Sequence, residues 1–245
     1  ITRIGNNIST ITAAPSSRHF YVDGSTSVLI LRRIKLTGGS TDSHGGSIAV
    51  RTQGTLISSH CIFSDNVASI SDGYGGAIYG NAALLMLNDT IIENNEARNG
   101  GGGIYVESSG TKLSMNRVII RNNDQLYTSS SSNYGGGGLS ISSSVDSIVI
   151  RESSFINNQA KSGNRGHHIR SRYTKSSNYY PKELKIVNTK FTNLLGSIVS
   201  DNLKNIEPDK CASSPCTIAP FNTNECYGRS PSPYGVICPA KSCVT

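Results

Sequence analysis

Residues 75–95, GGAIYGNAALLMLNDTIIENN, decide the fold of this chain. A glycine pair precedes an aliphatic residue, and about fifteen residues later an aliphatic residue precedes an asparagine pair. Related stretches run over 45–66, 101–123 and 136–158, and a degenerate copy of the repeat runs over 166–193. A unit of this length that recurs along a chain predicts a solenoid, in which each repeat packs on its neighbours.

Apolar residues keep fixed places inside the repeat. The alignment is anchored on a column of aliphatic or Phe side chains, spaced by 27, 29, 28, 35 and 36 residues: Leu36, Phe63, Ile92, Ile120, Phe155 and Phe191. Further columns lie two, five and seven positions earlier in each repeat. Alternation of this kind indicates strands with one buried face. The sequence therefore predicts an all-β solenoid with about three short strands in each repeat.

Glycine and asparagine are explained by the backbone. A chain that turns sharply before a strand needs positive φ or close approach, and glycine permits both. The asparagines that end the repeats predict a stacked structural ladder at a turn, formed by Asn66, Asn95, Asn123 and Asn158.

The repeats resemble those of polymorphic outer-membrane-protein (Pmp-like) β-helices. The best copies of the GGAI and FxxN motifs lie at 75–79 and 61–66, and the resemblance covers roughly residues 1–200. It implies a right-handed parallel β-helix with a surface-exposed or extracellular role of a structural or adhesive kind. It carries over no catalytic residue.

The last 40 residues differ in composition, so we expect a β-helix domain over 1–205 and a Cys/Pro-rich tail over 206–245. The tail holds five cysteines that are disulfide candidates: Cys211, Cys216, Cys226, Cys238 and Cys243. A short segment of this kind builds little core, so disulfides would hold it in an oxidising compartment. Cys61 occupies an inward column and reads as a small core residue. The odd tail cysteine could be free, pair with Cys61, bridge to another chain or pair beyond Thr245.

Two glycosylation sequons begin at Asn7 and Asn88. Together with the tail, they favour a secreted protein at the cell surface or outside the cell. The chain contains no run of eighteen apolar residues, so we expect no membrane-spanning helix. The net charge of +7 is scattered, and no nucleic-acid reader motif is present.

Three features lie outside the repeat's structural needs. Ile62, Ile91 and Ile119 form an outward apolar stripe, which we expect to be covered by the tail or a loop, or to contact another chain. Tyr173, Tyr179 and Tyr180 lie in a basic inserted loop and are candidates for glycan contact. His167 and His168 are neighbours whose side chains would point opposite ways in a strand, which disfavours a metal site.

The chemistry of a polysaccharide lyase or glycosidase needs convergent carboxylates. We interpret the acidic residues of the predicted solenoid as members of ion pairs. Glu93 would lie beside Arg121, and Asp89, Arg117 and Glu152 would alternate in sign along one column. We find no convergent acid pair, and we expect no cofactor, metal ion or catalytic residue.

The sequence predicts a secreted structural protein that forms or decorates an extracellular assembly such as a filament, an appendage or a cell-surface layer. Its partners would be copies of itself or filament neighbours, and glycans are further candidates. The alternative functions are a carbohydrate-binding adhesin and, after it, a carbohydrate-active enzyme.

Overall fold

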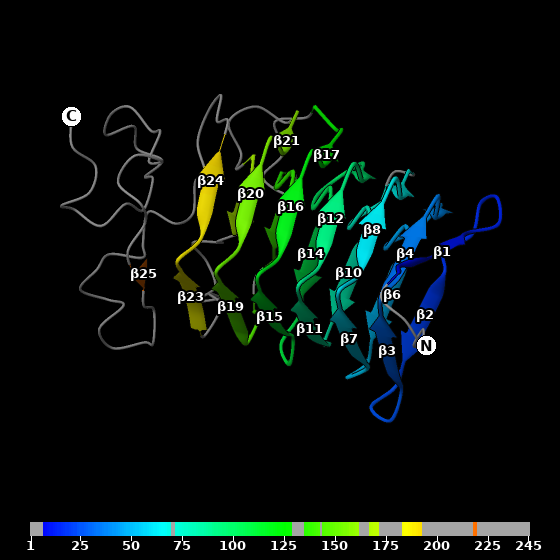
Figure 1. Ribbon diagram of the computed structural model, residues 1–245, viewed down its shortest axis with the longest axis horizontal. Coiled ribbons are helices and arrows are strands. Elements are labelled where there is room, and N and C mark those ends of the chain that lie inside the picture. Colours follow the sequence, from blue (N-terminus) through cyan, green and yellow to red (C-terminus); the bar gives the residue numbers. More distant parts are fainter. Residues whose placement is uncertain are drawn as a thin grey trace.

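A computed structural model describes residues 7–69, 72–128, 135–142, 144–161, 167–171, 183–192 and 218–219. Within these ranges every regular element is a β-strand, and all strand pairs are parallel. Figure 1 shows the strands stacked side by side along the long axis, from β1 at one end to β24 near the other. The all-β parallel solenoid is therefore confirmed. None of the described residues forms a helix that is long and apolar enough to cross a membrane.

Four sheets, here named A to D, run along the rod. The A sheet consists of β3 (Val28–Arg32), β7 (Thr55–Ser59), β11 (Leu84–Asn88), β15 (Lys112–Asn116), β19 (Ser147–Arg151), β23 (Glu183–Val187) and β25 (Ile218–Ala219). The B sheet consists of β1 (Ser9–Thr12), β4 (Ile34–Thr37), β8 (Ile62–Ser64), β12 (Ile91–Glu93), β16 (Ile119–Arg121), β20 (Ser154–Ile156) and β24 (Lys190–Thr192). The C sheet consists of β2 (Phe20–Asp23), β6 (Ile48–Arg51), β10 (Ile78–Asn81), β14 (Ile104–Glu107), β18 (Leu139–Ile141) and β22 (Ile169–Ser171). The D sheet consists of β5 (Ser40–Thr41), β9 (Val67–Ala68), β13 (Glu96–Ala97), β17 (Asp124–Gln125) and β21 (Gln159–Ala160).

The chain visits these sheets in the order C, A, B, D, and one such circuit is called a rung. Five complete rungs run from β2 to β21, and β22, β23 and β24 begin a sixth. The expectation of about three strands in each rung was wrong, because the D sheet adds a fourth. Its strands are only two residues long and begin with residues such as Glu96 or Gln159, so they carry no readable alternation.

The predicted register is confirmed. The B sheet pairs, in order, Leu36, Phe63, Ile92, Ile120, Phe155 and Phe191. The A sheet places Leu56, Leu85, Leu113, Ile148 and Leu184 in another continuous column, and all five are buried. Full burial of such a side chain contributes about 1.5–3 kcal/mol. Stacked columns of this kind form one apolar core along the rod.

Each rung bends from the A sheet to the B sheet at one residue with left-handed backbone. These corner residues are Arg33, His60, Asp89, Arg117, Glu152 and Asn188, with φ between 48° and 54°. A second corner, between the B and D sheets, uses Asp65, Asn94, Asn122 and Asn157, with φ between 51° and 57°. The bend at each corner aims two short strands along different sides of the core.

The glycine pair has two separate causes. Gly75 has a φ of 68°, and a Cβ atom there would lie 2.3 Å from the Ile78 carbonyl oxygen. Gly76 has no such φ, but its Cβ atom would lie 2.1 Å from the carbonyl oxygen of Gly102 in the next rung. The first glycine therefore permits a backbone conformation, and the second permits close stacking of rungs.

Candidate functional site

The four predicted ladder asparagines form one hydrogen-bonded stack inside the rod. Asn66, Asn95, Asn123 and Asn158 are buried between the B and D sheets. In each of the first three, the Nδ2 group donates to the Oδ1 atom of the asparagine in the next rung, at 2.9 Å. It also donates to a B-sheet carbonyl oxygen of the rung before, as Asn95 does to Phe63 at 3.0 Å. We call this stack the asparagine ladder.

Backbone amides complete the ladder. The amide N–H of Asn66 donates to Oδ1 of Asn95 at 3.0 Å, and the same bond recurs from Asn95 to Asn123 and from Asn123 to Asn158. These interior side chains are thus occupied by bonds to each other and to backbone, which makes the ladder structural. The left-handed residue is the one before each ladder asparagine, so this corner residue and the ladder asparagine have separate roles.

The isoleucine stripe lies on the outer face of the B sheet, as expected from its place in the repeat. Ile62, Ile91 and Ile119 are register partners in β8, β12 and β16, and all three are half-buried. Lys35 and Ser154 continue the column at its two ends. The stripe is therefore short and partly shielded by neighbouring side chains.

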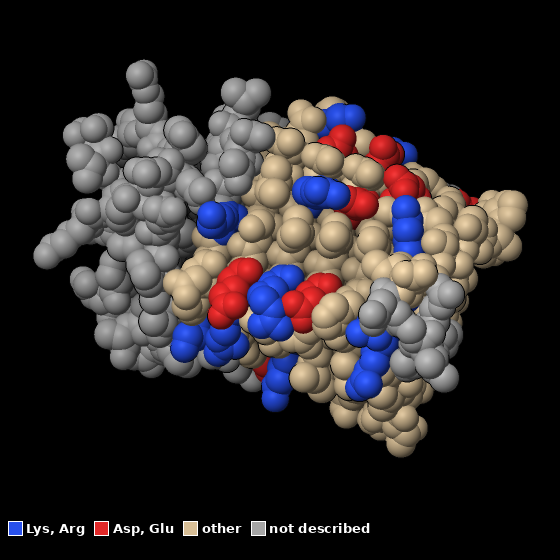
Figure 2. All heavy atoms as spheres, in the orientation of Figure 1, with Lys and Arg blue, Asp and Glu red and all other residues tan. Residues whose placement is uncertain are grey.

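Ion pairs stand on both sides of the stripe. Arg117 donates two hydrogen bonds to Asp89, at 2.6 and 2.9 Å, and the Arg117 guanidinium lowers the pKa of Asp89. Arg121 pairs with Glu93 through Nη2 at 2.5 Å and Nε at 2.7 Å. Figure 2 shows red and blue groups side by side on this face of the molecule, with tan surface between them. Surface pairs of this kind contribute at most about 1 kcal/mol, so they describe a solvated face.

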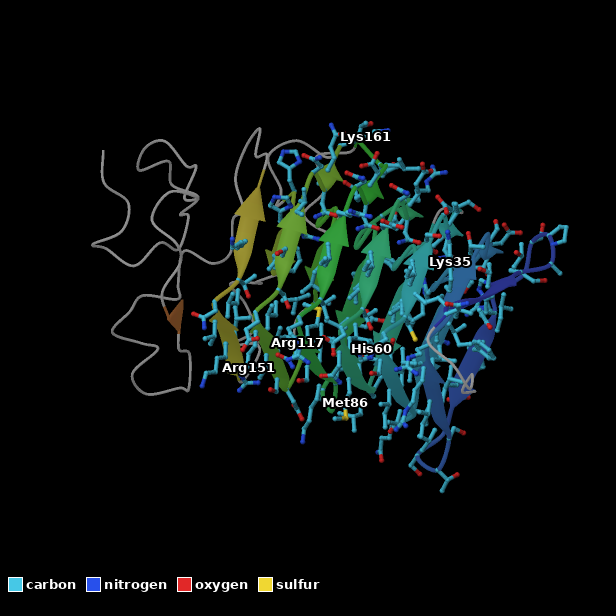
Figure 3. The ribbon with its side chains drawn as sticks, in the orientation of Figure 1. Lys35, His60, Met86, Arg117, Arg151 and Lys161 are labelled. Carbon is cyan, nitrogen blue, oxygen red and sulfur yellow. The ribbon has the colours of Figure 1, made fainter. Side chains whose placement is uncertain are left out.

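A more exposed apolar surface lies on the outer face of the A sheet, and sequence analysis missed it. Val28 is 57% exposed, and Ile30, Leu84 and Met86 are 37–38% exposed. Ile57, half-buried, pairs with Ile30 on one side and Met86 on the other. Figure 3 shows Met86 projecting outward from β11. We call these five residues the A-sheet apolar patch.

The signal for this patch is present in the sequence. Residues 28–31, VLIL, and residues 84–87, LLML, are unbroken runs of four apolar residues, whereas the other described A-sheet strands have shorter apolar runs. In a strand, successive side chains point to opposite faces, so such a run is apolar outside as well as inside. Only the inward members of each run enter the repeat columns.

The outer face of the C sheet carries an aromatic cluster. Tyr79 and Tyr105 are register partners with rings 5.9 Å apart, and both are buried. His44 stacks on Tyr79 at 4.6 Å, and Tyr74 contacts Tyr105 at 4.4 Å. The Tyr79 hydroxyl donates to a Glu107 carboxylate oxygen. Burial and this bond raise the pKa of Tyr79 to about 12. Tyr79 and Tyr105 are buried together, with Tyr74 packed against them, and form a small second hydrophobic core.

The D sheet corrects one expectation about acids. Glu96 and Asp124 are direct register partners in β13 and β17, whereas sequence analysis found no convergent acid pair. Burial raises the pKa of Asp124, the charge of Lys161 lowers it, and the charge of Glu96 raises it again. The described residues contain no group of three His, Cys, Asp or Glu that could hold a metal ion.

His167 and His168, in the degenerate last copy of the repeat, precede β22 and are not within a strand. The prediction that their side chains point opposite ways, as neighbours in a strand do, therefore does not apply to them. His168 is fully buried and His167 is half-buried. Both rings contact the fifth rung through Nδ1: His167 contacts the amide nitrogen of Ala160, and His168 contacts the side chain of Asn158.

The sequons and Cys61 are placed as follows. Asn7 is exposed ahead of β1, and Asn88 is a half-buried outward residue at the end of β11. The hydroxyl of Thr90 in the second sequon donates to the Asn88 carbonyl oxygen at 2.8 Å and is buried. Cys61 is a buried free thiol that contacts the Ser59 carbonyl oxygen at 3.3 Å. Glycosylation stays a prediction at both asparagines.

Several predicted sites lie outside the described residues. These are the loop tyrosines Tyr173, Tyr179 and Tyr180, the five tail cysteines, and the domain boundary between 205 and 206. The glycan-contact, disulfide and domain predictions therefore stay predictions.

Comparison with known families gives one match. Residues 60–81 and 89–107 match the repeat described as the Chlamydia polymorphic membrane protein repeat. Neither the search of curated proteins nor the search of solved structures returned a match. The two matched segments contain β8 to β10 and β12 to β14, which are consecutive parts of the stacked rungs. The chain therefore carries repeats of the Chlamydia polymorphic membrane protein type, a cell-surface family, on a parallel β-solenoid.

Proposed function

We propose that this chain is a cell-surface structural protein that forms or decorates an extracellular assembly through the outer faces of its β-helix. The observation that carries the proposal is the A-sheet apolar patch, where four large side chains are at least 37% exposed on one flat face. The columns and the asparagine ladder occupy the interior of the described rungs, which leaves outer surfaces for function.

The size of the patch favours a repeated contact. It spans three rungs, which is about 10 Å along the rod at a spacing of 4.8 Å. A stable pairwise interface buries about 800 Å² on each partner, more than a patch of this size provides. Many weak contacts that form together along an assembly bind more strongly than each one alone. A second copy of the chain, or a neighbouring filament subunit, fits this geometry.

Sedimentation velocity over a range of concentrations tests the proposal. We expect the wild-type chain to associate as concentration rises, and we expect Met86→Lys to weaken this association at least tenfold. The matched control is Ser114→Lys, because Ser114 stands in the column of Met86 one rung later and lies outside the patch. A wild-type chain that stays monomeric at high concentration would contradict the proposal, as would equal effects of the two variants.

A second candidate, a carbohydrate-binding adhesin, is favoured by Tyr21 on β2. Its side chain is 54% exposed, and the Arg18 guanidinium lies 5.5 Å from the ring centroid. An exposed ring beside a cation suits stacking on a sugar that carries an acidic group. Glycan-array binding that is lost in Tyr21→Ala or Tyr179→Ala but kept in Tyr21→Phe would support the adhesin. The carbohydrate-active enzyme is tested by incubation with pectin or alginate, and depolymerisation would contradict a purely structural role.

A further inference from the structure

His168 occupies a place in the rung where the second to fifth rungs have small residues, and where the first rung also has a histidine, His19. The registers of β6, β10, β14, β18 and β22 align it with Ser47, Ala77, Gly103 and Gly138. A Cβ atom on Gly138 would lie 3.1 Å from Ile120 Cγ2 and 3.2 Å from Asn158 Cγ. The asparagine ladder therefore restricts side chains at this position in the fifth rung. In the sixth rung an imidazole lies there instead.

The orientation of the Asn158 side chain determines what His168 does. Its Oδ1 atom accepts from the Asn123 amide N–H at 3.1 Å, and its Nδ2 group donates to the Ile120 carbonyl oxygen at 2.9 Å. The group facing His168 Nδ1, at 3.1 Å, is therefore the N–H donor of Asn158. His168 Nδ1 must accept, which requires a neutral ring with its proton on Nε2. His168 thus receives the last side-chain donor of the ladder.

The neighbouring His167 makes the same kind of contact, with a backbone amide in place of a side-chain amide. The amide N–H of Ala160 donates to His167 Nδ1 at 3.0 Å, and a backbone N–H cannot act as an acceptor. Burial lowers the pKa of His167 below its ordinary value of 6.5. Two adjacent histidines therefore accept hydrogen bonds from the fifth rung, and both are neutral when they do so.

We propose that His167 and His168 form an acid-sensitive clasp that holds the sixth rung, β22 to β24, on the end of the asparagine ladder. Protonation places an N–H group opposite the Asn158 N–H, and another opposite the Ala160 N–H. Each of these contacts then changes from attractive to repulsive in a buried setting. Acidification would release the sixth rung while the third and fourth rungs, whose ladder asparagines do not titrate, stay folded.

Burial, and not a neighbouring charge, sets the response of His167 to pH. Arg170, buried on β22, and Lys161, exposed after β21, are the cations on the described segments next to the pair. Asp124 lies one rung further, opposite Gln159 of β21, and burial raises its pKa. The charge of Lys161 acts on Asp124 and that of Arg170 on Tyr105, and burial is what lowers the pKa of His167. The clasp contributes stability above about pH 6.5, and this contribution is lost as the pH falls through the lowered pKa of His167.

Hydrogen exchange on the full chain tests the clasp. Between pH 7.5 and 5.0, after correction for intrinsic rates, we expect peptides from β23 and β24 to lose at least about tenfold in protection, which is the effect of one pKa unit. Peptides from β11 and β12 should keep their protection. His168→Asn, which supplies an amide that does not titrate, should remove most of the pH response. His60→Asn is the control, because His60 is exposed at a corner far along the column.

A loss of protection spread evenly over all rungs would overturn the proposal, and so would an unchanged pH response in His168→Asn. A measurement on the wild-type chain covers the case in which that variant misfolds. Nitrogen-15 chemical shifts at pH 8 should show both rings neutral with the proton on Nε2. A proton on Nδ1 of either ring would contradict the clasp.

Discussion

The asparagine ladder and the A-sheet apolar patch overlap in the second and third rungs, and they differ in how far their side chains are already bonded within the chain. In the ladder, the Oδ1 atom of Asn95 accepts two hydrogen bonds, and its Nδ2 group donates two. On the patch, Val28 and Met86 project from strands whose inward side chains include the fully buried Leu31, Leu85 and Leu87. Substitution inside therefore removes several hydrogen bonds at once, whereas substitution on the patch removes none of these bonds. The difference separates residues that specify the fold from residues that are available for function.

The largest expected effect is at the centre of the ladder. Asn95→Leu would leave the backbone N–H of Asn66 and the Phe63 carbonyl oxygen without their bonds, and would break the ladder on both sides. Each buried group left unpaired costs about 1–3 kcal/mol, so we expect a loss of about 3–5 kcal/mol in unfolding free energy. Chemical denaturation measures this loss. Asn94→Gly, at the adjacent left-handed corner, is the control and should change stability by less than about 1 kcal/mol.

The patch should behave in the opposite way. We expect Met86→Lys to change unfolding free energy by less than about 0.5 kcal/mol, because a surface substitution away from packed groups is nearly neutral. Denaturation of Met86→Lys beside Asn95→Leu makes the comparison in one experiment. A loss of several kcal/mol in Met86→Lys would mean that the patch belongs to the fold.

The ion pairs on the B sheet lie between these extremes. Arg121→Gln removes the bonds to Glu93 and should lower stability by about 0.5 kcal/mol, as is usual for surface pairs. The difference from wild type should vanish in 1 M salt, where the screening length falls to about 3 Å. A difference that persists in high salt would show that the arginine acts by packing over the isoleucine stripe.

A small stabilising effect, whose size depends on pH, is expected at the D-sheet acid pair. The pKa of Asp124 is raised in the folded chain, so its charged form is disfavoured there and protonation stabilises the fold. Asp124→Asn should therefore stabilise the chain at pH 7 by about 0.2–1 kcal/mol, the range for like charges directly opposite in a sheet. Thermal unfolding should show this gain at pH 7 and none at pH 3. Destabilisation at pH 7 would contradict the account.

Sequence patterns predicted the interior much better than the exterior. The column from Leu36 to Phe191 follows from inward side chains that recur because each rung must bury them on the next. Exposure depends on how far neighbouring side chains reach, so the stripe around Ile91 could be assigned to a face but not to its half-buried state. His168 could not be assigned, because its role depends on where the ladder stops in space.

The D-sheet acid pair and the A-sheet apolar patch were not predicted from the sequence, for a different reason. Glu96 and Asp124 become neighbours only through the two-residue D strands, which the alternation of apolar residues does not reveal. Met86 and Ile30 lie within apolar runs whose inward members already explain the repeat. In both cases the outward position carries information that the fold itself does not require.

The central claim is that the interior of this solenoid specifies its fold and its outer faces bind neighbours. Electron microscopy of the purified chain at increasing concentration, with Met86→Lys imaged beside it, tests this claim most directly. We predict that the wild-type chain forms filaments or side-by-side arrays and that the variant gives separate rods of unchanged shape. Separate wild-type rods at every concentration would contradict the claim.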